Sequence, residues 1–166
     1  MRTLVALPVI LFAVILQSAI ISRIPLLSGF ADLPLVMLAA WALQDGVDTA
    51  WHWAIGTGLL VGFVSGIPWF VPVISYMVVV ILAQMLQQRV WQAPLLAMFL
   101  VTFLGTILMN VLSLGILRLF GTPLPIADTL GLLTLPSVLL NLLLAIPVFA
   151  IMRDLARWAH PSPEGV

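Results

Sequence analysis

The chain alternates between long apolar stretches and short polar breaks. Six predominantly apolar stretches, separated by breaks rich in Pro, Gly, Asp, Gln or Arg, occupy residues 4–21, 33–43, 51–66, 73–86, 94–117 and 130–152. They lack the apolar–polar alternation that is typical of barrel strands. Because a bilayer core takes about 20 helical residues to cross, the pattern predicts an all-α membrane protein of about six transmembrane helices, with residues 1–166 forming a single domain.

Two of the stretches allow another interpretation. The second is short and begins at the Asp32–Leu33–Pro34 step, which is compatible with a tilted or half-inserted helix, so five spans is the alternative count. The first resembles the apolar part of a signal peptide. It is long for one and lacks a small-x-small cleavage site, so we expect it to be retained.

The arginines predict an orientation. With six spans, four of the six Arg residues fall on one side of the membrane and two on the other. The richer side holds Arg2, Arg89, Arg153 and Arg157. Because cytoplasmic loops carry an excess of Lys and Arg, both termini are predicted to be cytoplasmic.

Composition supports a membrane location and excludes several classes of function. Hydrophobic residues make up 63% of the chain and charged residues 7%, whereas a soluble domain carries roughly 25% charged residues. The net charge is +0. The chain therefore lacks the clustered positive charge of a nucleic-acid-binding surface. The chain has no cysteine, which excludes disulfides and zinc–thiolate sites.

Chemically active side chains are few. We expect the six basic and six acidic residues to lie at the ends of the stretches or in loops. This placement disfavours ion pumps and carriers of charged substrates, which usually need an ionisable group within the membrane. The sequence has no paired-aspartate, Ser–His or metal-ligand pattern of a membrane protease or lipid transferase. We therefore expect no enzymatic activity, no cofactor and no metal site.

One close group of acids and histidine consists of Asp45, Asp48 and His52. The spacing of Asp48 and His52 suits a shared helix face and a bound cation. Acids at the start of a helix more often cap its free N–H groups, and we favour that interpretation.

The third stretch contains glycines at every fourth position, Gly58, Gly62 and Gly66. They predict a flat stripe on one helix face, where another backbone can approach closely. The approaching helix is either a neighbour in the same chain or the span of a partner protein. A phosphate-binding role is excluded, because the segment lacks the Lys and the strand–loop–helix setting of a P-loop.

Two asparagines are predicted to lie within the membrane at similar depth. Asn110 and Asn141 belong to consecutive antiparallel helices. One hypothesis is that they face one another, or a shared partner, and form hydrogen bonds across the helix interface. We favour ordinary helix packing, with interhelical hydrogen bonds of about 0.6 kcal/mol each.

Over nearly its whole length, the chain resembles the family of the rod shape-determining protein MreD. The Gly-rich stretch GTGLLVGFVSG, residues 56–66, is similar to a segment of that family. The last stretch, LPSVLLNLLLAIPVFAIMRDLAR, residues 135–157, is similar to its closing helix. The sequence departs from the family where an acidic residue often follows the glycines, since Ile67, Pro68 and Trp69 stand there. No role for that acid can be carried over.

The resemblance implies a non-enzymatic scaffold in the bacterial inner membrane. Its partner would be MreC, bound through lateral helix contacts, and its indirect partners would be RodA, a class B penicillin-binding protein and MreB. The implied fold is the bundle of the S subunits of energy-coupling-factor vitamin transporters. Such an S subunit is the alternative function. Against it, Ala6, Ala13 and Ala19 in the first stretch include no pair four residues apart, which those subunits commonly use for docking.

Overall fold

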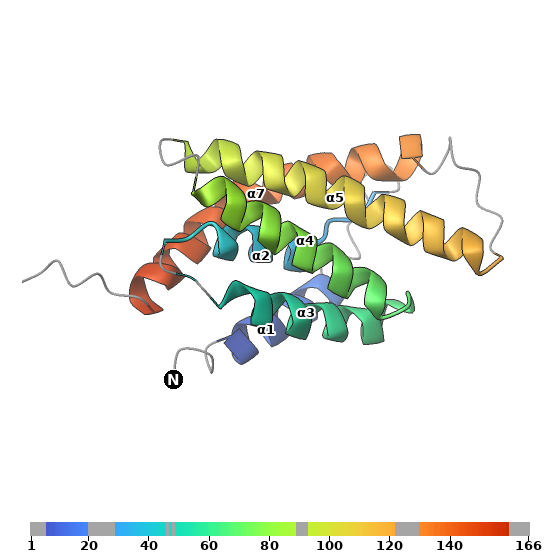
Figure 1. Cartoon of the computed structure of the whole chain (residues 1–166), viewed down its shortest axis with the longest axis horizontal. Helices are drawn as coiled ribbons and strands as arrows, with labels where there is room; N and C mark the ends of the chain where they lie inside the picture. Colours follow the sequence, from blue (N-terminus) through green and yellow to red (C-terminus); the bar gives the residue numbers. More distant parts are fainter. Residues whose placement is uncertain are drawn as a thin grey trace, which may run out of the picture.

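The computed structural model describes residues 6–19, 29–45, 47, 49–88, 93–121 and 130–159. These residues form helices and no strand, so the predicted all-α fold is confirmed. Figure 1 shows a bundle whose long helices run roughly parallel or antiparallel to one another. The elements are α1 Ala6–Ala19, α2 Leu33–Ala42, α3 Ala50–Ser65, α4 Phe70–Gln87, α5 Pro94–Leu119, the π-helical turn η3 Leu130–Thr134 and α7 Leu135–Ala159.

The helices fall into two classes by length. Three are long and apolar enough to cross a membrane, and they cover Phe70–Gln87, Pro94–Leu119 and Gly131–Trp158. Three others, Pro8–Ala19, Leu33–Ala42 and Ala50–Ser65, are apolar but shorter. Each predicted stretch therefore contains a helix. A count of six membrane crossings stays a prediction.

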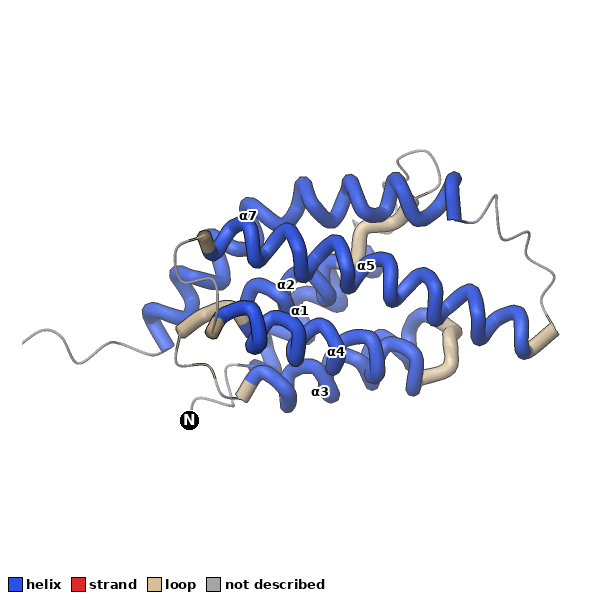
Figure 2. Tube along the Cα trace, turned by 45° about the horizontal axis from the view of Figure 1, so that its top comes forward, coloured by secondary structure: helices blue, strands red, loops and turns tan. Residues whose placement is uncertain are grey.

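Helix α2 forms the centre of the bundle. All ten of its residues are buried, and it packs against each of the other five helices. Figures 1 and 2 show it enclosed by its neighbours. A helix of 10 residues is about 15 Å long, whereas the 26-residue α5 is about 39 Å long. Helix α2 can therefore fill the centre along only part of the length of the bundle.

The glycine stripe of α3 packs against α4. A Cβ added at Gly58 would lie 2.7 Å from the Cα of Val73, and one added at Gly62 would lie 2.6 Å from the Cα of Trp69. The start of α4, together with its N-cap Trp69, thus occupies the groove that the two glycines form. Gly66 has another role, because its φ of 68° ends α3 in a left-handed conformation that glycine adopts without strain.

One end of the bundle is tightly packed. Trp41 of α2 stacks on Trp53 of α3, with ring centroids 4.5 Å apart and planes at 24°. The side chain of Gln87 in α4 donates a hydrogen bond of 2.9 Å to the carbonyl oxygen of Gln44, just after α2. Figure 1 places the beginning of α1 and the end of α7 at this end as well. We call it the closed end.

Candidate functional site

Asp32 is a charged residue inside the bundle. It directly precedes α2 and caps it, with the Leu35 N–H donating a 3.0 Å hydrogen bond to Oδ1. Tyr76 of α4, which is fully buried, donates its hydroxyl to the same carboxylate. Asp32 stands at the end of an apolar stretch, as expected for the charged residues, but α2 begins within the bundle, so the carboxylate lies inside it.

The carboxylate of Asp32 acts only as an acceptor in its hydrogen bonds. The Tyr76 hydroxyl lies 2.9 Å from Oδ1 and 3.1 Å from Oδ2, and the Leu35 N–H is directed at Oδ1. A hydroxyl has one proton, so it can serve only one carboxylate oxygen at a time. Oδ2 consequently retains capacity to accept further donors.

Helix α1 holds the extended backbone before α2 through one side chain. The amide of Gln17 donates from Nε2 to the carbonyl oxygen of Ala31 and accepts at Oε1 from the Leu33 N–H, at 2.9 Å. Non-helical backbone at membrane depth is tolerated only where protein groups or a water-filled cavity satisfy it. Gln17 supplies this compensation from the side of α1.

Helix α7 holds the same segment from the other side. The Phe30 N–H donates to Ser137 Oγ at 3.0 Å, and the Asp32 N–H donates to Asn141 Oδ1 at 2.7 Å. The close approach of this segment to α7 requires a glycine at position 29, because a Cβ there would lie 2.6 Å from the backbone nitrogen of Ser137. The segment from Gly29 to Asp32 is thus fixed between two helices that are distant in sequence.

Asn141 continues the network into α5. Its Nδ2 donates to Thr106 Oγ1 at 2.9 Å, and the Thr106 hydroxyl donates to the carbonyl oxygen of Thr102 at 2.7 Å. Asn141 and Thr102 are fully buried. The partner of Asn141 on α5 is thus Thr106, which lies one helical turn before Asn110. The side chain of Asn110 instead lines a cavity next to the network.

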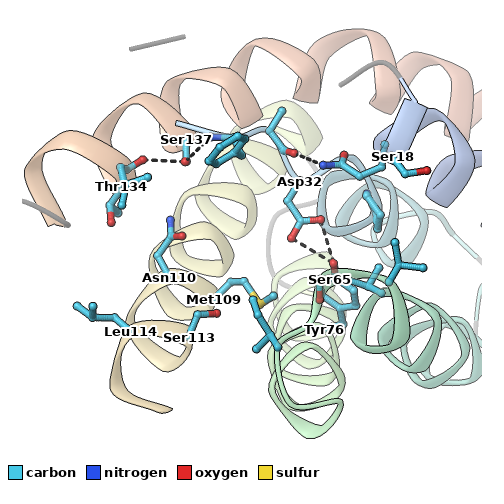
Figure 3. Close-up of a pocket in the computed structure, with 18 of the residues that line it drawn as sticks. Ser18, Asp32, Ser65, Tyr76, Met109, Asn110, Ser113, Leu114, Thr134 and Ser137 are labelled. Carbon is cyan, nitrogen blue, oxygen red and sulfur yellow. Dashed lines mark hydrogen bonds between the residues drawn. The ribbon is translucent and has the colours of Figure 1, made fainter. Parts of the chain in front are cut away.

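The cavity has a volume of about 720 Å³ and opens beside the start of α2. Figure 3 shows Asp32 and Tyr76 on one side of it, with Met109, Asn110 and Ser113 of α5 on another. Its remaining walls come from the end of α1, the end of α3, η3 and the start of α7. It therefore lies toward the end of the bundle that is opposite to the stacked tryptophans, which we call the open end.

The lining combines a mostly apolar wall with a few polar groups. The polar or charged residues are Gln17, Ser18, Asp32, Ser65, Tyr76, Asn110, Ser113, Thr134 and Ser137. Among the described residues that line the cavity, none is Arg, Lys or His. Within the described part of the chain, no three His, Cys, Asp or Glu side chains gather as metal ligands would. The arrangement suits the binding of a small molecule more than acid–base or metal chemistry.

Of the acid–His group predicted from the sequence, the described residues are Asp45 and His52, and neither is the N-cap of α3. Helix α3 has Thr49 as its N-cap, without a side-chain hydrogen bond, and the side chain of Asp45 accepts a 3.3 Å hydrogen bond from Gln87 of α4. The cap interpretation is therefore wrong for Asp45. His52 is exposed and its ring lies against that of Trp51, with centroids 3.4 Å apart. Asp48 lies outside the described residues.

Asp32, Gln17 and Tyr76 were not predicted from the sequence to be members of a site. A signal for Asp32 was present, because an Asp followed by Leu33 and Pro34 is typical of an N-cap with Pro in the first turn. The short apolar stretch that follows also indicated a helix that begins inside the membrane. Gln17 is a polar residue within an apolar stretch, but its partners, like those of Tyr76, depend on tertiary packing and have no signal in the sequence.

No model of a protein family matches this chain, and no curated protein and no solved structure matches it either. The function is therefore proposed from the sequence and the fold of the chain itself.

Proposed function

We propose that the chain is a non-enzymatic scaffold subunit of the bacterial cell-elongation machinery in the inner membrane. The observation that carries the proposal is the resemblance of residues 56–66 and 135–157 to the MreD family. The fold is compatible with this role, because the described residues form one helical bundle with no further domain beside it. A protein of this kind contacts partners through helix faces and short loops.

The contact with MreC would use a face other than the glycine stripe, because α4 already covers Gly58 and Gly62. Peripheral helices offer apolar faces that the bundle leaves exposed. On α7, Leu135, Leu139 and Leu143 follow one another at intervals of one turn, and their exposed fractions are 67%, 57% and 67%. We propose this exposed α7 stripe as the surface for the single span of MreC.

Co-expression with tagged MreC tests the scaffold role. We expect the two proteins to co-purify in a mild detergent, and depletion of the chain to abolish rod shape. Leu139→Trp should weaken the complex, whereas Ile81→Trp, at a similarly exposed position on α4, should leave it intact. Failure of the wild-type chain to co-purify with MreC at matched expression would contradict the proposal.

The cavity favours a second candidate, a substrate-binding S subunit of an energy-coupling-factor transporter. A closed scaffold has no need of a cavity of about 720 Å³ with convergent polar groups. With both termini cytoplasmic, as the arginines predict, the open end would face outward, where such a subunit takes up its substrate. Binding of a vitamin to the purified chain at nanomolar concentration would support this candidate. Absence of binding to every vitamin of a panel would exclude the S-subunit function.

A further inference from the structure

The cavity has the size of a site for a small organic molecule. Its volume of about 720 Å³ falls within the roughly 300–1,000 Å³ that is usual for ligand pockets. A bare metal ion or a single water would leave most of this space empty. The apolar wall from Met109 and Leu114 of α5 suits a hydrocarbon or aromatic body.

The charge of the lining specifies the ligand further. Asp32 is the acidic residue of the lining, and the described lining residues include no basic side chain that would neutralise it. A carboxylate in a largely apolar site is stabilised by a paired positive charge. Oδ2 shares the Tyr76 proton at 3.1 Å and can accept another donor.

We propose that the cavity binds an organic cation, namely a protonated amine attached to an apolar body, with the ammonium group on Asp32. Both a soluble amine and an amine-headed lipid such as phosphatidylethanolamine have this chemistry. The inference does not depend on the scaffold role. If the chain is instead an S subunit, its substrate would be an organic cation.

Three matched probes test the charge requirement on the purified full-length chain. Phenethylamine, phenethyl alcohol and phenylacetate differ in their head groups, and their binding can be measured by calorimetry. We expect phenethylamine to bind about tenfold more tightly than the alcohol, because a hydrogen bond between two charged groups is stronger than one from a neutral donor. Phenylacetate should bind more weakly than either. Equal binding of the amine and the alcohol would overturn the proposal.

Two variants test the role of the carboxylate. Asp32→Asn keeps the shape of the side chain and its cap on α2, and should weaken phenethylamine binding about tenfold. Tyr76→Phe keeps the carboxylate and removes its competing donor, so it should strengthen binding. The matched control is Asp154→Asn, which neutralises an acid whose side chain is 69% exposed, and which should change nothing. Should Asp32→Asn fail to fold, weaker amine binding by Tyr76→Phe would still contradict the proposal.

Lipid analysis separates the two sources of the amine. Native mass spectrometry of the chain, extracted from membranes that contain phosphatidylethanolamine and phosphatidylglycerol, should show selective retention of the former if the natural ligand is a lipid. Phenethylamine binding without retained lipid would identify a soluble amine. If the chain retains phosphatidylglycerol preferentially, or binds neither phenethylamine nor phosphatidylethanolamine, the cavity is not a cation site.

Discussion

The two ends of the bundle differ in what fills the centre. At the closed end, α2 occupies the axis, and its aromatic side chain Trp41 stacks on Trp53. At the open end, α2 has not yet begun, and the axis holds a cavity with Asp32 at its inner edge. The shortness of α2 thus explains both the packed end and the cavity. A helix about 15 Å long can fill only about half of a bilayer core that is about 30 Å thick. Close packing and the cavity thus lie at different places along one axis.

The largest expected effect comes from breaking the α3–α4 contact with Gly62→Leu. The new side chain would displace the α4 backbone, because even a Cβ would lie 2.6 Å from the Cα of Trp69. We expect a loss of about 3 kcal/mol in the free energy of unfolding, at the upper end of the usual effect of overpacking. Unfolding in a mixed detergent measures it.

The matched control for Gly62→Leu is Gly115→Leu on α5. A Cβ at Gly115 would have no neighbour within 4 Å, so stability should change little. Equal losses in both variants would show that the α3–α4 contact is looser than its geometry indicates.

The next effect concerns the polar network between the two ends. Asn141→Leu removes the hydrogen bonds to the Asp32 N–H and to Thr106 Oγ1, and we expect a loss of about 1–2 kcal/mol in the free energy of unfolding. Combination with Thr106→Val should be less than additive, since the two residues share a bond. Combination with Asn110→Leu should be additive. Strong coupling of Asn110 to Asn141 would instead show that these two side chains interact.

A smaller effect is expected from Tyr76→Phe at the border of the cavity. The substitution removes the hydroxyl that donates to Asp32 at 2.9 Å, and it leaves the buried ring in place. We expect a loss of about 1 kcal/mol. In the Asp32→Asn background the loss should be smaller, because the amide is a weaker acceptor than the carboxylate. An equal loss in both backgrounds would argue that the hydroxyl acts independently of Asp32.

The smallest expected effect is that of added side-chain volume at the open end, and the same addition at α2 provides the comparison. Ser113→Leu adds volume where the cavity can receive it, so stability should change by less than about 0.5 kcal/mol. Ala40→Leu adds volume to α2, where Ala40 is fully buried, and should lower stability by about 1–3 kcal/mol. Comparable losses in the two variants would mean that the open end has no usable space.

Much of the architecture was predictable from apolar patterning, but the site was not. Long apolar stretches require helices in a membrane, so the helices and their order followed from the sequence. The glycine spacing predicted close packing, although it left open that the neighbour would be α4. An interhelical hydrogen bond from Asn141 was predicted, and Asn141 donates one to Thr106 of α5. That Gln17 and Asn141 also hold the extended segment before α2 could not be predicted, because it depends on where that segment lies in space.

The shortness of α2 also bears on how the protein is made. Membrane helices generally insert one by one and then associate, but a helix of 10 residues cannot cross the bilayer on its own. The backbone at Asp32 pairs with Asn141, which is synthesised 109 residues later. Residues 29–42 therefore reach their final place only after α7 has emerged from the ribosome. A Cys placed at Ala39 should react with a membrane-impermeant thiol reagent in chains that stop before residue 130, and should be protected in the complete chain.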